Sequence, residues 1–258
     1  MSVRLLVEDK IARVTIDRPE RMNAVDQATE AELTRTWETI EKTRGIRVVI
    51  LTGAGDKAFC TGADMKSGSG LSGLEYWAAP RPGGFGGLAL RDTLDVPVIA
   101  RVNGHALGGG MEMMLGCDIV IASSNATFGL PEPRVGRLAL DGGIALLARR
   151  IPYVWAMGML LTGRRVDAAE ALRMGLVNEV VAPEALDGAV ARWTEDILAC
   201  APLSLRAIKE MVRAGEKMSA KEAQMLRLPS LIEALKSSDQ DEGVRAFKEK
   251  RAPQWRGR

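Results

Sequence analysis

Two glutamates and a run of glycines have the residue types and spacing that catalysis could use. Glu112 follows the glycines Gly108–Gly110 in the stretch NGHALGGGMEMMLGCD, and Glu132 follows in the stretch TFGLPEPRVG. A glutamate surrounded by methionines is expensive to bury without a purpose. Two carboxyl groups in different surroundings can serve as general acid and general base on neighbouring carbons. We therefore predict that Glu112 and Glu132 are catalytic, although Glu132 taken alone is more typical of an exposed loop residue beside two prolines.

The glycine run predicts a junction between a strand, VPVIARV, and a helix that begins near Gly109. The first N–H groups of a helix have no intrahelical acceptor and can hold an oxyanion, and glycine lets a substrate carbonyl approach the backbone. An oxyanion hole needs a second donor from another loop, and the N–H of Ala63 in FCTGADMK is the candidate. A glycine run also serves tight packing between strand and helix, and this alternative stays open.

Other catalytic and ligand-binding patterns are missing from the sequence. His105 is the one histidine, no G-x-S-x-G stretch occurs, and Met113 stands where a dinucleotide-binding fingerprint has its third glycine. The phosphate-binding pattern G-x-x-x-x-G-K-[ST] is also missing. We expect no metal site, and we expect His105 to be a structural or pocket-lining residue.

Composition and charge narrow the class of protein. The 258 residues include 35 basic and 33 acidic ones, so the net charge of +2 gives no long-range attraction for nucleic acid or an anionic membrane. Cys60, Cys117 and Cys200 are too few and too widely spaced for a disulfide framework. With no long apolar segment and no signal-peptide pattern, we expect a cytoplasmic protein that does not bind nucleic acid or membranes.

The elements that must position these residues alternate along the first half of the chain. Apolar runs predict strands over residues 3–9, 11–17, 47–53, 96–102 and 117–123. Asp26 is a candidate N-cap for a helix whose apolar face is formed by Ala28, Leu33, Trp37 and Ile40. After residue 143 helical spacing dominates, interrupted by a strand over 176–181. This pattern predicts an α/β fold with a sheet-bearing core and a helical C-terminal region.

Residues 67–87 read SGSGLSGLEYWAAPRPGGFGG, which predicts a long loop without a regular element. Its apolar residues, including Leu74 and Tyr76, favour a lid over a solvated linker. Trp77 and Phe85 of this lid, together with Leu140, predict a partly apolar substrate pocket.

Several motifs, taken together, resemble the enoyl-CoA hydratase (crotonase) family. They are RPERMNAV, VVILTGAGDKAFCTGADMK, NGHALGGGMEMMLGCDIVIAS, TFGLPEPRVG, LLTGRRVDAAEALRMGLVNEVV and AFKEKR, in that order and over nearly the whole chain. The segments PGGFGGL and WRGR look most like the carnitinyl-CoA dehydratase branch. The resemblance implies a spiral of ββα repeats over residues 1–195, a helical trimerisation region over 196–258, and a homotrimer or dimer of trimers.

The resemblance also implies roles for individual residues. Ala63 and Gly109 match the two backbone donors that hold the acyl-thioester oxygen, and Glu112 and Glu132 match the two catalytic glutamates of the hydratases. The acyl-CoA-binding strand corresponds to Ala63, Asp64, Met65 and Lys66, and Lys250 corresponds to a lysine that reaches the CoA phosphates, often of a neighbouring subunit. No metal or redox cofactor is implied, because coenzyme A is part of the substrate.

The expected reaction is the reversible addition of water across the α,β double bond of an acyl-CoA thioester. Alternatives within the family are a carnitinyl-CoA-type dehydratase, a Δ3-Δ2 enoyl-CoA isomerase and a thioesterase, but both glutamates are retained, which favours hydration or dehydration. A non-catalytic RNA-binding relative is disfavoured because its basic helix is missing: residues 26–44 contain more acidic than basic side chains.

One turn departs from the family pattern. The glycine-rich turn after the second glutamate reads RLALDGG, with Leu140 and Asp141 in place of small residues. Asp141 is expected either to contact a polar acyl group or the catalytic water, or to cap the helix that follows.

Overall fold

The computed structural model describes residues 1–67 and 70–258 and contains two sheets. The larger sheet has the order β1 (Val3–Glu8), β2 (Ile11–Ile16), β3 (Val48–Gly53), β5 (Val98–Val102), β7 (Ile119–Ser123) and β10 (Glu179–Val181). The smaller sheet has the order β4 (Ala58–Cys60), β6 (His105–Leu107), β8 (Thr127–Gly129) and β9 (Val166–Asp167). Apart from the antiparallel pairs β1–β2 and β8–β9, neighbouring strands run parallel. The strands predicted from apolar runs are all present.

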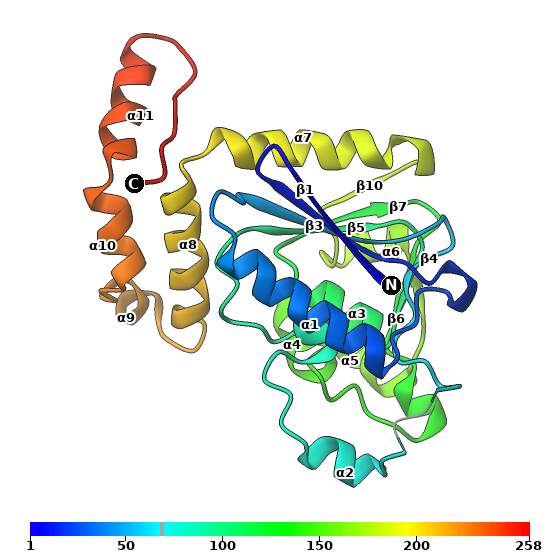
Figure 1. Ribbon diagram of the computed structural model, residues 1–258. Helices are drawn as coiled ribbons and strands as arrows, with labels where there is room; N and C mark the ends of the chain where they lie inside the picture. The colour runs from blue at the N-terminus through cyan, green and yellow to red at the C-terminus, as the bar shows by residue number, and fades with distance from the viewer. Residues whose placement is uncertain (68–69) are drawn as a thin grey trace.

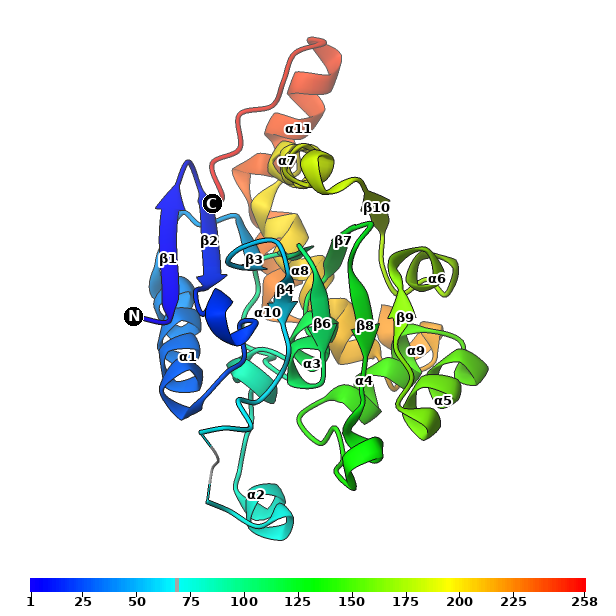
Figure 2. The same cartoon turned by 90° about the vertical axis from the view of Figure 1, so that its right-hand side faces the viewer.

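Helices surround the larger sheet on both faces and extend beyond it (Figure 1). The α-helices are α1 (Gln27–Lys42), α2 (Gly73–Ala78), α3 (Gly109–Leu115), α4 (Gly143–Arg150), α5 (Tyr153–Thr162), α6 (Ala168–Arg173), α7 (Leu186–Ala199), α8 (Pro202–Gly215), α9 (Ala220–Gln224), α10 (Pro229–Lys236) and α11 (Ser238–Lys248). The described residues also form the short 3-10 turns η1 (Pro19–Arg21), η2 (Phe85–Gly87), η3 (Glu132–Val135) and η4 (Pro183–Ala185). Helices α8–α11 form an arm at one side of the molecule, in which α8 packs against the body through Lys209 (Figures 1 and 2).

The central strand β3 is buried on both of its faces, which explains its unbroken apolar sequence. Val49 and Leu51 belong to the main hydrophobic core, which also contains Trp37 of α1. Val48 and Ile50 point to the opposite face, where α7 covers the sheet (Figure 1). Both faces of a parallel sheet are normally covered in this way, because its crossover helices pack against it.

Helix α1 begins as the sequence predicts. Asp26 is its N-cap and accepts hydrogen bonds from the backbone N–H of Thr29 at 2.8 Å and from its hydroxyl at 2.7 Å. The buried face contains Thr29 in addition to Leu33, Trp37 and Ile40, whereas Ala28 is exposed. The inclusion of Ala28 in the apolar face was therefore wrong. Thr29, whose N–H is bonded to Asp26, occupies the buried position instead.

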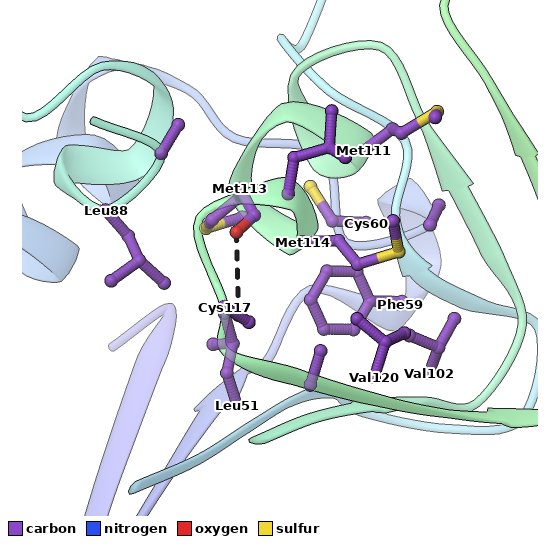
Figure 3. Packing of buried hydrophobic residues seen from close by; sticks show 14 of the residues in the cluster. Leu51, Phe59, Cys60, Leu88, Val102, Met111, Met113, Met114, Cys117 and Val120 are labelled. Atoms are coloured by element: carbon purple, nitrogen blue, oxygen red, sulfur yellow. Dashed lines mark hydrogen bonds between the residues drawn. The ribbon is translucent and has the colours of Figure 1, made fainter. Parts of the chain in front are cut away.

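Helix α3 is buried along its whole length and packs its methionines into the main core. Met111, Met113 and Met114 are fully buried, and Figure 3 shows them among Phe59, Leu88 and Val120. All three cysteines are free: Cys60 and Cys117 are buried near these methionines, and Cys200 is exposed between α7 and the arm. The methionines therefore fill the core, as their helical spacing suggests.

The predicted lid, residues 67–87, differs from expectation in two parts, helix α2 and the 3-10 turn η2. Residues 68 and 69 lie outside the described residues, but Gly73–Ala78 forms the short helix α2. The prediction of no regular element was wrong here because Ser72 and Glu75 form a capping box that satisfies two free backbone N–H groups. The division into 1–195 and 196–258 stays a prediction. None of the helices in the described ranges is long and apolar enough to cross a membrane.

Candidate active site

The glycine run at the start of α3 is packed too tightly for side chains. A Cβ on Gly110 would lie 2.0 Å from the carbonyl oxygen of Cys60, and one on Gly109 would lie 2.3 Å from the ring of Phe85. Gly108, the N-cap, has a φ of +54° and lies against the carboxyl group of Glu132. Close packing between β4 and α3 is therefore one reason for the run, as the alternative interpretation suggested.

The two predicted backbone donors lie on neighbouring segments. A Cβ on Gly62, whose φ is +87°, would lie 2.9 Å from the amide nitrogen of Gly109. Val25 bonds to the carbonyl of Gly62 at 2.8 Å and to the N–H of Asp64 at 2.9 Å, which leaves the N–H of Ala63 outside this pairing. Within the described residues, neither the Ala63 nor the Gly109 N–H has an acceptor. Two adjacent free donors are what an oxyanion hole requires.

Glu112 is buried in the first turn of α3 with 3% of its surface exposed. Its Oε1 accepts a hydrogen bond from the backbone N–H of Gly143, the first residue of α4, at 2.8 Å. Burial, reinforced by the negative charges of Asp141 and Glu132, raises the pKa of Glu112 to about 8. The carboxyl group therefore carries a proton at neutral pH.

Glu132 is the first residue of η3 and is half-buried rather than exposed on a loop. Its Oε1 lies 2.9 Å from the position of a Cβ on Gly108, so the carboxyl group sits at the N-terminus of α3. Its Oε2 is buried without a hydrogen-bond partner among the described residues, and burial raises the pKa of the group. A buried unpaired carboxyl oxygen favours a role with a ligand or water over a structural role.

The segment predicted to bind the acyl-CoA, Ala63–Lys66, lies beside the free donors and is largely exposed. The carboxylate of Asp64 accepts bonds from Arg18 at 3.1 Å and from the N–H of Lys66 at 3.1 Å, and these bonds hold its pKa below the usual range. Met65 is 67% exposed and touches Arg137 of the neighbouring loop. Asp64 thus fixes the shape of the segment, and the cations Lys66 and Arg137 stand at its edge.

The predicted acyl-pocket residues separate into two groups. Phe85 and Asp141 are buried, and the N–H of Phe85 donates to the carbonyl of Asp141 at 3.2 Å, next to Gly109. Leu140 is 37% exposed beside them, whereas Trp77 of α2 is 65% exposed. The expectation that Asp141 caps the next helix was wrong, because the N-cap of α4 is Gly142. Asp141 instead accepts a hydrogen bond from the hydroxyl of Tyr76.

Lys250 lies away from the glutamates (Figure 1), and His105 links two strands of the smaller sheet. Lys250 follows α11, which stands at the opposite end of the molecule from α2 (Figures 1 and 2). The chain by itself therefore does not bring Lys250 to Glu112. The Nδ1 of His105 is 2.7 Å from the hydroxyl of Thr127 and joins β6 to β8, in agreement with the structural role expected for this histidine.

Three contributors to the site were missed by sequence reasoning: Gly143, Arg18 and Tyr76. The pair Gly142–Gly143 directly before the helical stretch IALLARR was the available signal for Gly143, since a helix that starts on glycine offers free N–H groups. Arg18 and Tyr76 carry no comparable local signal, because their partners Asp64 and Asp141 are far away in the sequence.

The comparisons with known proteins decide the family. A model of the family described as enoyl-CoA hydratase/isomerase matches residues 7–258. The chain belongs to this family. It is similar to the (E)-benzylidenesuccinyl-CoA hydratase of Thauera aromatica, with 42% identity over 100% of both chains, and to the carnitinyl-CoA dehydratase of Proteus mirabilis, with 38% identity over 100% of this chain and 99% of the relative.

Solved structures agree with this assignment. The enoyl-CoA hydratase from Bacillus anthracis superimposes with a TM-score of 0.91 at 31% identity, covering 100% of both chains. The enoyl-CoA hydratase from Mycobacterium tuberculosis H37Rv gives a TM-score of 0.90 at 34% identity, covering 100% of this chain and 99% of that one. The fold is therefore the crotonase-type α/β fold, and the chain is a hydro-lyase of the enoyl-CoA hydratase type that acts on an acyl-CoA substrate.

Proposed function

We propose that the protein adds water reversibly across the α,β double bond of an enoyl-CoA thioester, with Glu112 and Glu132 as the catalytic carboxyl groups. The observation that carries the proposal is the pair of carboxyl groups with raised pKa values at the N-terminus of α3. Free N–H groups of Ala63 and Gly109 next to them support an oxyanion hole for the thioester oxygen. The reaction then needs acyl-CoA and water but no metal or redox cofactor.

The chemistry requires one ionised and one protonated carboxyl group. The ionised group accepts a proton from water as the water oxygen bonds to Cβ, and the electron pair of the double bond moves toward the thioester oxygen. The two N–H donors hold the negative charge that develops there, and the protonated group donates its proton to Cα. Because a negative charge on either glutamate raises the cost of a second one, the pair favours a state with one proton between them.

Binding of coenzyme A needs local cations, because the net charge of the chain is near zero. Lys66 is exposed two residues after Asp64, and Arg137 lies within reach of Met65. We propose that Ala63–Lys66 forms the edge along which the thioester lies and that these two cations meet the CoA phosphates. Lys250 contributes only if the arm of another subunit brings it there, which fits a homotrimer or dimer of trimers.

The test is loss of the enoyl-thioester absorbance with purified wild-type protein and with Glu112→Gln and Glu132→Gln. General acid–base groups typically contribute about 100- to 10,000-fold to the rate, so each variant should lose activity within that range. Glu195→Gln, an exposed glutamate on α7, is the matched control and should retain full activity. If Glu112→Gln or Glu132→Gln retains the wild-type rate, the two-carboxyl mechanism is refuted.

The acyl group is best tested with a panel of substrates. Crotonyl-CoA represents the short linear case, and the names of the two similar relatives supply two bulkier ones, benzylidenesuccinyl-CoA and carnitinyl-CoA. We propose that one of these two bulkier acyl groups is preferred, because the two similar relatives are named for such substrates and match this chain over its whole length. A higher kcat/KM for crotonyl-CoA than for both of the others would contradict this preference.

A further inference from the structure

Asp141 is a buried carboxylate that interacts with the charge of Arg81 but forms no direct ion pair among the described residues, and its surroundings connect it to both halves of the proposed site. It is 7% exposed, and none of the ion pairs within residues 1–67 and 70–258 involves it. Its carboxylate accepts the hydroxyl hydrogen of Tyr76, while its carbonyl oxygen accepts the N–H of Phe85. Burying a charge without an ion pair costs stability, so a buried charge of this kind indicates a role in the site.

Tyr76 anchors α2 toward the body of the protein. It is half-buried, whereas the other five residues of α2 are exposed. The guanidinium group of Arg81 stacks 4.0 Å above the centre of its ring and pairs with Glu30 of α1 at 2.8 Å. Burial and the bond to Asp141 raise the pKa of Tyr76, so its hydroxyl stays protonated and remains a donor.

The other side of Asp141 leads directly to Glu112. Gly143, two residues later, donates its N–H to Glu112 at 2.8 Å. A Cβ on Gly143 would lie 2.7 Å from Ala139 and 3.1 Å from the side chain of Glu112, so this turn packs closely against the glutamate. The ring of Phe85, tied to Asp141 through the backbone, packs against Gly109.

We propose that Asp141 and Tyr76 are a positioning pair: their hydrogen bond holds α2 against the Asp141–Gly143 turn and thereby fixes the N–H that orients Glu112. The inference rests on the proposed function, in which Glu112 is catalytic. In this arrangement α2 does more than cover the substrate. Its position determines the position of Asp141, and the backbone from Asp141 to Gly143 then determines the orientation of the Glu112 carboxyl group. Asp141 itself does not touch the reacting atoms in this arrangement.

The charge of Asp141 gives the pair a measurable signature. The groups that face Glu112 are Glu132 from η3 and Asp141 from the turn before α4, and both raise its pKa. Those that face Tyr76 are Asp141, Arg81 and Glu30. Removing the negative charge of Asp141 therefore lowers the pKa of Glu112, whereas removing the hydroxyl of Tyr76 leaves that charge in place.

The experiment compares Tyr76→Phe, Asp141→Asn and the double variant with two matched controls. The controls are Tyr153→Phe on α5, where the tyrosine is 70% exposed, and Asp56→Asn in an exposed turn. Amide hydrogen exchange of residues 73–90 is measured without substrate. The kcat and KM values are measured over about pH 6 to 10 for whichever of crotonyl-CoA, benzylidenesuccinyl-CoA and carnitinyl-CoA the wild type converts fastest.

The proposal predicts faster exchange in residues 73–90 for both single variants and a fall of roughly tenfold in kcat with little change in KM. The alkaline limb of the pH profile moves to lower pH in Asp141→Asn but not in Tyr76→Phe. The double variant is no worse than the more impaired single variant, since both changes break one bond. The controls match the wild type in every measurement.

Opposite results overturn the proposal in distinct ways. Unchanged exchange in both single variants shows that the pair does not hold α2, and additive losses in the double variant show that the residues act separately. Loss of substrate binding alone, seen as a rise in KM at constant kcat, assigns Asp141 to substrate recognition instead. If the wild type hydrates no enoyl-CoA but the variants still exchange faster, the proposed function fails while the link between Tyr76 and Asp141 stands.

Discussion

Glu112 and Glu132 lie at the same helix terminus but have different partners. Glu112 is held by the N–H of Gly143, whereas one oxygen of Glu132 has no partner in the described part of the chain. The first glutamate is therefore fixed in orientation, and the second is free to meet a water molecule or the substrate. A difference of this kind allows two identical residue types to take different roles in one reaction.

The raised pKa of Glu112 also predicts how stability depends on pH. The folded protein binds this proton more tightly than the unfolded chain, since the pKa rises from 4.5 to about 8. The resulting stabilisation is complete below the unfolded value and is lost as pH rises through the folded value, and each tenfold difference in proton affinity corresponds to about 1.4 kcal/mol. Glu112→Gln does not titrate, so we expect it to gain stability relative to wild type between about pH 5 and pH 8.

Urea unfolding at these two pH values measures the difference in free energy of unfolding. The exposed Glu195→Gln serves as the control and should show the same difference from wild type at both values. An equal difference for Glu112→Gln at both pH values would mean that burial does not perturb the proton affinity of Glu112.

The sequence predicted those parts of the candidate site that lie in continuous motifs. Gly109 and Glu112 share one helix start, and Ala63 follows a glycine in a second motif, so their types and spacing were informative. The bond between Gly143 and Glu112 spans 31 residues, and the bond between Tyr76 and Asp141 spans 65. Pairs at such separations depend on tertiary packing, which no local pattern in a single sequence encodes.

At the scale of elements, the junction between β4 and α3 sets the geometry of the site. Gly110 allows the helix to approach the carbonyl of Cys60, where a Cβ would lie at 2.0 Å. In Gly110→Ala the added Cβ collides with the Cys60 carbonyl, so α3 and β4 must move apart. We therefore expect a loss of about 1–3 kcal/mol in the free energy of unfolding. A Cβ on Gly188 in α7 would have no neighbour within 4 Å among the described residues, and Gly188→Ala should stabilise by about 0.5–1 kcal/mol.

Denaturant unfolding of these two variants tests the packing argument, because each adds the same methyl group to a helix. Similar changes in the midpoint for both variants would show that contact with β4 does not constrain α3. Activity of Gly110→Ala should fall as well, since Glu112 lies two residues along the same helix.

Regular elements were predictable where one physical signal dominated. Buried strands such as β3 carry unbroken apolar runs, and α1 carries both an N-cap and a buried face, so each was expected at nearly its observed bounds. Helix α2 was missed because it buries none of its residues and depends on a capping box within a segment rich in Gly, Ser and Pro. In contrast, the cap expected from Asp141 was wrong because a tertiary partner, Tyr76, takes its side chain.

At the scale of the whole molecule, the arm formed by α8–α11 exposes many apolar side chains to solvent in the single chain. Exposed apolar residues on α8, α10 and α11 are Ile208, Val212, Ile232, Leu235, Val244 and Phe247. Such a concentration is typical of a protein–protein interface, and we predict one here. We expect a homotrimer or dimer of trimers in which this arm packs against another subunit.

Analytical ultracentrifugation of wild type and Phe247→Ser tests the assembly. Phe247 is 86% exposed in the single chain, and its replacement should shift the protein toward smaller species at low concentration. Leu6→Ser on β1, which is 50% exposed in the chain, is the control and should sediment as wild type. A wild-type protein that sediments as a monomer would refute both the interface and the proposed contribution of Lys250.

The unequal burial of the three cysteines makes the native sequence suitable for site-specific labelling. Burial raises the pKa of the Cys60 and Cys117 thiols to about 12, so they react slowly with maleimides, whereas Cys200 is exposed. Cys200 lies where α7 ends and the arm begins. A single fluorophore attached there reports on movement of the arm by anisotropy or energy transfer, without any residue having been replaced.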